Sequence, residues 1–217
     1  MVYSAEIRWF FKSLTEVSVI ENWFKAQQKY FSEQWDRTDI YLWQPDLEKH
    51  SVKIREGKVE VKVLSKDRGV VIIDPANSGI SNNWVKYSFE LKETDTENNA
   101  LLKQFSQPTD KPDKSIWVRV DKERLLVKYA LHAPNDSLSL IPENEWPDEG
   151  CGVELTRIKI NQQEYYTFGL EAFSKTQCEE MNLEKVLSQL IPEININGLH
   201  YLQSHSYPSF LANLHKV

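Results

Sequence analysis

The sequence lacks the features that mark several large classes of protein. Its two cysteines, Cys151 and Cys178, lie 27 positions apart and form neither a CxxC pair nor part of a metal-ligand cluster. No run of about 18 apolar residues is present that could cross a membrane as a helix. A glycine-rich phosphate loop and a glycine-flanked nucleophilic serine are also missing. A disulfide, a membrane helix and the common nucleotide-binding loops are therefore not expected.

Positive charge is scarce over the chain as a whole. The 217 residues include 26 lysines and arginines and 32 aspartates and glutamates, which gives a net charge of -6 at pH 7. Such a chain is not attracted as a whole to nucleic acid or to anionic membranes, so any anion site must be local. The charged N-terminal residues do not resemble a secretory signal, and a reducing cytoplasmic location is expected. A hydrophobic content of 41% can supply the core of one domain over residues 1–217.

Alternation of apolar and polar residues predicts a chain built mainly from strands. Residues 3–12 alternate between an apolar face and a face that is polar except at Phe10, and they predict a first strand. Residues 16–31 have the spacing of an amphipathic helix, with Thr15 as a possible N-cap. Further alternating runs predict strands at 37–43, 51–55, 59–64, 84–91, 116–121, 124–131, 152–160 and 164–172.

The segments between the strands indicate how they pair. Glu56-Gly57-Lys58 and Asn161-Gln162-Gln163 predict tight hairpins, which favour antiparallel neighbours. Two stretches rich in proline, acids and amides predict solvated loops at 92–115 and 132–150. Helices are expected at 177–191 and 206–215, separated by Pro192 and the segment 195–198.

The predicted strands carry charged side chains on one face and apolar side chains on the other. In strand 51–55, for example, Lys53 and Arg55 alternate with Val52 and Ile54. Two arrangements are compatible with this pattern. One is an open sheet whose charged face meets water. The other is a closed barrel with the charged face inside and helices packed on the apolar exterior. Spacing alone does not decide between them.

Three short motifs follow one another in the first half of the chain. They are an Asp-x-Tyr strand at 39–41, a basic-x-Arg strand at 53–55 and a Glu-x-Lys strand at 60–62. In this order they resemble the central block of the CYTH, or triphosphate tunnel metalloenzyme, family. Residues 152–155 and 166–172 resemble its acidic C-terminal strands, and 206–211 resembles its closing helix. The resemblance implies an α+β, mainly antiparallel β fold: a closed eight-stranded tunnel-like barrel with helices packed outside.

The resemblance also implies a ligand. CYTH proteins bind triphosphates in a charged tunnel, with basic residues on the phosphates and glutamates on a divalent metal, Mg²⁺ or Mn²⁺. The implied phosphate ligands are Arg8, Lys53, Arg55, Lys62, Lys86, Arg119, Arg124 and Lys128. The implied metal ligands are Glu6, Glu60, Glu154 and Glu171.

The chain departs from the family pattern at three positions. The N-terminal Glu-x-Glu-x-Lys motif aligns with residues 6–10, where Arg8 replaces a metal-ligating acid and Phe10 replaces a lysine. Thr156 stands where hydrolytic members often have a second acid after Glu154. These exchanges make the interior more positive and leave fewer carboxylates for a metal.

Two function classes therefore stand beside each other. The first is a metal-dependent triphosphatase, an acid anhydride hydrolase acting on polyphosphate or an organic triphosphate. The second is a non-catalytic module that binds or senses a phosphorylated metabolite. Adenylyl cyclase is a weaker third, because nothing in the sequence identifies an adenine pocket. No catalytic residue is assigned, and neither a membrane nor a nucleic acid is expected as a partner.

Overall fold

The computed structural model describes residues 1–27, 29–30, 32–43, 47–90, 117–132, 137–142 and 144–214. The loop predicted at 92–115 lies outside these residues. The elements are β1 (Val2–Phe11), α1 (Leu14–Ala26), β2 (Ser32–Leu42), β3 (His50–Arg55), β4 (Lys58–Asp74), β5 (Asn77–Glu90), β6 (Trp117–His132), β7 (Ser137–Ile141), β8 (Glu149–Ile160), β9 (Gln163–Ser174), α3 (Glu179–Ile194), the short 3-10 helix η2 (Tyr201–Gln203) and α4 (Tyr207–Leu214). No helix in these ranges has the length and apolar character needed to cross a membrane.

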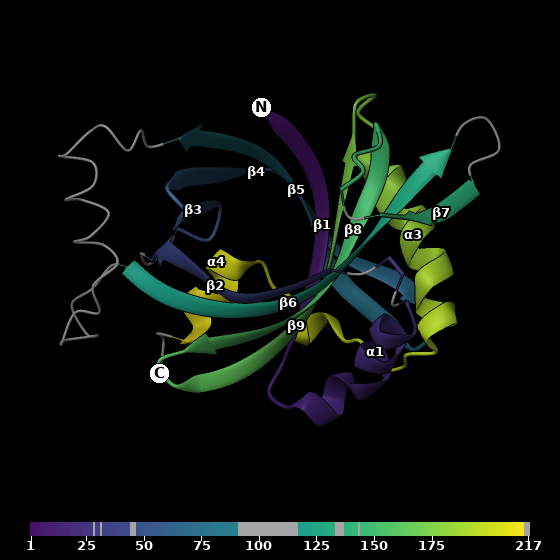
Figure 1. The fold of residues 1–217 in the computed structure, drawn as a ribbon, viewed down its shortest axis with the longest axis horizontal. Coiled ribbons are helices and arrows are strands. Elements are labelled where there is room, and N and C mark those ends of the chain that lie inside the picture. Colours follow the sequence, from purple (N-terminus) through teal and green to yellow (C-terminus); the bar gives the residue numbers. More distant parts are fainter. Residues whose placement is uncertain are drawn as a thin grey trace.

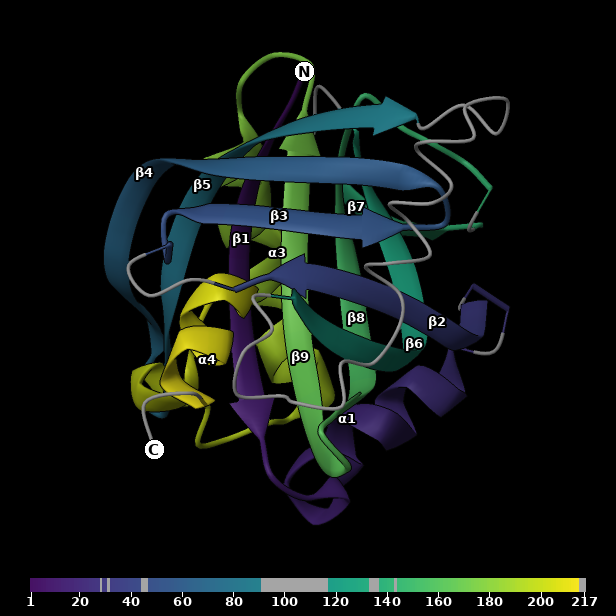
Figure 2. The same cartoon turned by 90° about the vertical axis from the view of Figure 1, so that its left-hand side faces the viewer.

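Eight antiparallel strands close into a barrel, which confirms the predicted fold class. Their order around the barrel is β2-β3-β4-β5-β1-β9-β8-β6, and pairing of β6 with β2 closes the ring. Figure 2 shows β2, β3 and β4 crossing in front of β1, β9 and β8. The short strand β7 is additional and pairs with the end of β6 beyond the barrel seam.

The two predicted hairpins are confirmed, and their turn geometry explains them. Glu56 and Gly57 join β3 to β4 with φ values of 46° and 73°. Asn161 and Gln162 join β8 to β9 with φ values of 48° and 69°. A two-residue turn with both central φ values positive matches the right-handed twist of its flanking strands. These turns therefore fix the register of both hairpins.

Several strands differ from their predicted bounds. β4 runs to Asp74, past a polar stretch where irregular pairing at 64–66 and 67–69 interrupts the alternation. Gly69 takes a φ of 68° there. The runs at 116–121 and 124–131 form one continuous strand, β6. β7 lies within the stretch predicted as a loop at 132–150.

The helix ends also differ from their predictions. Ser13, rather than Thr15, is the N-cap of α1, and it forms a capping box with Glu16. Pro192 does not end the C-terminal helix, because α3 includes it and continues to Ile194. The helix stops where Asn195 takes the left-handed conformation, with a φ of 57°.

Two apolar cores lie on opposite sides of the barrel wall. The outer core joins α1 and α3 to the outward-facing side chains of β1, β6, β8 and β9. The inner core fills one end of the barrel interior, where α4 inserts Phe210 and Leu211 against Phe10, Ile158 and inward-facing residues of β2, β6, β8 and β9. Figure 1 accordingly shows α4 on the other side of β1 from α1 and α3. We call this inner core the apolar end.

Candidate functional site

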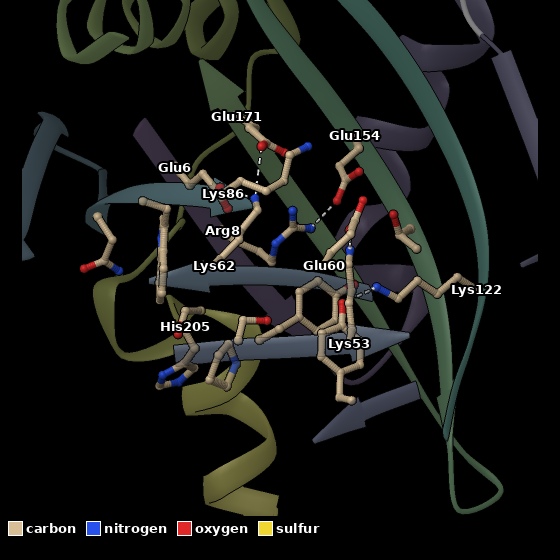
Figure 3. Close-up of a pocket in the computed structure, with 18 of the residues that line it drawn as sticks. Glu6, Arg8, Lys53, Glu60, Lys62, Lys86, Lys122, Glu154, Glu171 and His205 are labelled. Atoms are coloured by element: carbon tan, nitrogen blue, oxygen red, sulfur yellow. Dashed lines mark hydrogen bonds and ion pairs between the residues drawn. The ribbon is translucent and has the colours of Figure 1, made fainter. Parts of the chain in front are cut away.

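A cavity of about 120 Å³ occupies the barrel interior beside the apolar end. This is several times the roughly 10–15 Å³ that a single water needs, so the cavity has room for a group of oxygen atoms. We call it the charged chamber, and Figure 3 shows charged side chains converging on it from different strands. Its charged lining consists of Glu6, Arg8, Arg37, Lys53, Arg55, Glu60, Lys62, Lys86, Lys122, Arg124, Glu154 and Glu171.

Strand alternation explains how these side chains meet. All eight barrel strands contribute to the lining, because every second residue of a strand points inward. Neighbouring strands place charged residues opposite one another: Lys53 faces Glu60, and Glu6 faces Glu171. The charged face predicted from the sequence is thus the inside of the barrel, and the open-sheet alternative is wrong.

Asp39 on β2 organises the basic residues at the base of the chamber. Its fully buried carboxylate accepts hydrogen bonds from Arg55 Nε at 2.6 Å and Arg55 Nη2 at 2.9 Å. Lys122 Nζ lies 2.9 Å away, and Lys53 Nζ lies 3.7 Å away. Burial would raise the pKa of Asp39, but these cations hold it far below its usual range. Arg37 Nε, on the same strand, lies 3.4 Å from Asp39 Oδ1. Asp39 therefore positions four cations without lining the cavity itself.

The two lysines near Asp39 have pKa values below the ordinary value of a lysine. Burial, the largest cause, lowers the pKa of Lys53 to about 7, with nearby Arg55 and Lys122 adding to the effect. Burial likewise lowers the pKa of Lys122 to about 8, although Asp39 opposes the shift. An anion entering the chamber would favour the charged form of both lysines.

The chamber's carboxylates are each held by a fixed cation. Lys62 Nζ bridges the facing pair, contacting Glu6 and lying 3.0 Å from Glu171 Oε1. Glu60 Oε2 lies 2.8 Å from Lys53 Nζ. Burial would raise the pKa values of Glu60 and Glu171, but their lysine partners lower both to about 2. Glu60 and Glu171 are therefore ionised at neutral pH and already paired with lysines.

Glu154 on β8 is held by two arginines. Arg8 Nη1 lies 2.5 Å from Glu154 Oε1, and Arg124 Nη1 lies 3.5 Å from Glu154 Oε2. Figure 3 shows the Arg8–Glu154 contact as a dashed line across the middle of the chamber. Although the Glu154 carboxyl is buried, Arg8 and Arg124 keep its pKa well below the usual range.

Cations outnumber anions on the chamber wall. Eight lysines and arginines and four glutamates line it. Even with the buried Asp39 included, the excess is three positive charges when Lys53 and Lys122 are both protonated. Lys86 makes no hydrogen bond or ion pair within the described part of the chain, although its charge acts on Glu60 and Glu171. The buried hydroxyl of Thr156 also has no hydrogen-bond partner there. This wall favours an anionic, oxygen-rich ligand.

Ten of the twelve predicted site residues line the chamber, and two do not. Arg119 points outward: its side chain is 53% exposed and its Nη2 lies 2.9 Å from Asp121. Lys128 is buried elsewhere, with its ammonium over the Trp146 ring at 3.5 Å from the centroid. Arg119 was misplaced because it lies an odd number of residues from Arg124 on one continuous strand, so the two face opposite ways.

Sequence reasoning missed several chamber residues. Lys122 was overlooked because the predicted gap between two strands fell on it, although it is in phase with Arg124. Asp39 and Tyr41 belong to the Asp-x-Tyr motif at 39–41, but the motif alone does not predict their roles in the chamber. The remaining missed chamber residues with charged or polar side chains are Arg37, Ser51, Asn82, His205, Ser206 and Tyr207. Ser51 is in phase with Lys53 on β3, so alternation alone could have found it. The positions of His205 and Tyr207 depend on the course of the C-terminal segment, which local patterns do not reveal.

The three departures from the family motif have separate structural settings. Phe10 belongs to the apolar end, where its ring stacks on Phe210 at a centroid distance of 3.9 Å. Thr156 lies on the chamber wall, next in line to Glu154 on the inner face of β8. Arg8 lies in the chamber itself. Only Phe10 has therefore left the polar site.

Comparison with known proteins gives fold likeness alone. No family model and no curated protein matches the sequence. Among solved structures, the PH1819 protein of Pyrococcus horikoshii OT3 is similar at a TM-score of 0.48 and 15% identity, over 96% of this chain and 99% of that one. The Mimivirus capping enzyme triphosphatase is similar at a TM-score of 0.46 and 9% identity, over 88% of this chain and 89% of that one. The RNA triphosphatase Pct1 of S. pombe, solved in complex with the Spt5 CTD, is similar at a TM-score of 0.40 and 9% identity, over 92% of this chain and 85% of that one. All three TM-scores are below 0.5.

Proposed function

We propose that this protein binds a phosphate-rich anion, such as a triphosphate or short polyphosphate, in the charged chamber. The observation that carries the proposal is the excess of enclosed cations, eight against four glutamates on one wall. Buried cations without enough counter-charge are costly unless an anion pairs with them. A triphosphate supplies several negative charges on a narrow chain of oxygens, which suits lysines and arginines arriving from several strands.

Lys86 gives the sharpest test of binding. Because it lines the chamber and has no ion-pair partner among the described residues, its removal leaves the network of paired charges intact. We expect Lys86→Ala to weaken tripolyphosphate binding about tenfold, measured by isothermal titration calorimetry. Lys58→Ala is the matched control, because Lys58 is 53% exposed and pairs with Glu90 outside the chamber. Equal affinity of the two variants, or no binding by the unaltered protein, would contradict the proposal.

A divalent metal does not fit the four glutamates as they are arranged. Each carboxylate contacts a lysine or arginine, and Glu154 contacts two arginines. Within the described ranges, no group of three or more histidine, cysteine, aspartate or glutamate side chains is placed to hold a metal ion. A cation that bound there would have to displace these ion pairs. Binding, rather than metal-dependent hydrolysis, is therefore the better supported function.

Triphosphate hydrolysis is the second candidate, favoured by one observation. Glu6 and Glu171 face each other on β1 and β9 and share a single lysine, Lys62, so two carboxylates lie close together on the chamber wall. Phosphate release from tripolyphosphate, ATP and thiamine triphosphate, with Mg²⁺ or Mn²⁺, tests this function. Turnover that disappears in Glu171→Gln would establish it, and binding without turnover would leave the protein a binding or sensor module.

A further inference from the structure

The guanidinium of Arg8 occupies a built position in the middle of the chamber. Its side chain is 11% exposed, with Nη1 2.5 Å from Glu154 Oε1 and 3.0 Å from Thr167 Oγ1. The Tyr207 ring covers it, at 5.0 Å from the guanidinium carbon to the ring centroid. A guanidinium has five N–H donors, and the contacts to Glu154 and Thr167 use only Nη1. The other donors remain for oxygens of a ligand.

Gly169 on β9 makes this position possible. Strand β9 lies between β1 and β8, and Gly169 is the register partner of both Arg8 and Glu154. Arg8 therefore reaches across β9, over the glycine, to contact Glu154. A Cβ at residue 169 would lie 2.6 Å from the guanidinium carbon and 2.7 Å and 2.8 Å from its two terminal nitrogens. The missing side chain is the space that Arg8 fills.

The charge of Arg8 is permanent under physiological conditions. Burial by itself would lower the pKa of the guanidinium, but Glu154, Tyr207 and Glu6 raise it above its usual range. Glu154 is therefore neutralised by a cation of the chain. The positive charge of Arg8, at hydrogen-bond distance from Glu154, would repel a divalent metal that approached this carboxylate.

We propose that Arg8 is a built-in cation that does the work of a divalent metal in the charged chamber, so that the phosphate-rich anion binds without metal. This inference rests on the proposed function. It adds that the affinity is independent of Mg²⁺ and Mn²⁺, and that Arg8 is the residue responsible. Replacing Arg8 with an acid should convert the same chamber into one that needs a metal.

Titration of the unaltered protein with tripolyphosphate, in EDTA and then in Mg²⁺ or Mn²⁺, tests the first part. We expect dissociation constants that agree within about threefold after correction for metal bound by free tripolyphosphate. Binding more than tenfold weaker in EDTA would overturn the role of Arg8 but leave the proposed function standing. No binding under either condition would instead overturn the proposed function. This comparison needs no variant and does not depend on the folding of one.

Three variants test the second part. Arg8→Gln should lose at least tenfold in affinity, and Arg8→Glu should lose about a hundredfold in EDTA and recover at least tenfold when Mn²⁺ is added. Arg119→Glu is the matched control, because this arginine of β6 faces solvent, and it should bind as the unaltered protein does in both media. Circular dichroism and thermal unfolding establish that each variant is folded. Unchanged metal-free affinity in Arg8→Gln, or no metal rescue of folded Arg8→Glu, would overturn the proposal.

Discussion

The two ends of the barrel interior share the strands β1, β2, β6, β8 and β9 and have opposite characters. On β1, Arg8 lies in the charged chamber, and Phe10, two residues on, lies in the apolar end. On β8, Thr156 and Ile158 mark the same boundary. Burying apolar side chains stabilises the fold, whereas burying an excess of like charges opposes it. The barrel therefore draws stability from one end, which allows the other end to hold charge for a ligand.

The largest effect is expected from removing the anion beneath the chamber. Asp39→Asn would leave four cations without their shared counter-charge, namely Arg37, Lys53, Arg55 and Lys122. We expect a loss of about 3–5 kcal/mol in the free energy of unfolding, measured by urea denaturation. Asp121→Asn is the control, because this carboxylate is 42% exposed and its loss should cost about 1 kcal/mol or less. Equal losses in both variants would show that Asp39 is not the organising anion.

The apolar end should respond differently. Phe210→Ala removes a ring that stacks on Phe10 and meets Tyr165 edge-on. We expect a loss of about 3 kcal/mol in unfolding free energy, with the affinity for tripolyphosphate nearly unchanged, because Phe210 does not line the chamber. Leu202→Ala, at a position that is 67% exposed, should change stability by about 0.5 kcal/mol or less. A variant that stays stable but loses binding would mean that the two ends are not separable.

The two lysines with lowered pKa values make the chamber contribute to the pH dependence of stability. Lys53 and Lys122 have pKa values of about 7 and about 8 in the folded protein, below the ordinary value of 10.5. Between pH 7 and 9 these two lysines bind more protons in the unfolded chain than in the folded one, so their contribution to the free energy of unfolding rises with pH. The buried thiol of Cys151, whose pKa is raised by burial, contributes in the opposite direction towards pH 9. The rise is at most about 1.4 kcal/mol per pH unit for each lysine. Urea denaturation across this range measures it, and Lys53→Met should reduce the slope.

The smallest effect concerns ligand affinity and pH. Because a bound anion favours protonated Lys53, binding should take up protons and weaken as pH rises from 7 to 9. We expect up to about a tenfold increase in the dissociation constant per pH unit relative to Lys53→Arg, whose charge persists. Measuring both proteins at each pH cancels the ionisation of the ligand itself. Parallel profiles would show that Lys53 does not titrate with binding.

The sequence predicted the barrel well and the chamber partly. Alternation in residues 3–12 and the turns at 56–57 and 161–162 are local features, so they identified β1 and both hairpins. The bulged stretch near Gly69 breaks the two-residue period, which hid most of β4.

Side chains that act at a distance were harder to predict. Asp39 gathers cations from β3 and also from β6, a strand that meets β2 only where the barrel closes. The Gly169 space for Arg8 likewise depends on register across three strands. In one continuous strand β6, Lys122 lies two residues from Arg124 and shares its face, whereas Arg119 lies five residues away and faces the other side. The prediction of two separate strands hid this relation.

The closure of the barrel by α4 limits how a long ligand can be held. Phe210 and Leu211 fill the interior beyond the chamber, so a linear phosphate chain entering the chamber would stop against them. The protein would then bind a polymer at its terminus and could not slide along it, because the chain could not pass through the barrel. The number of protein molecules bound would follow the number of chain ends and not the total amount of phosphate.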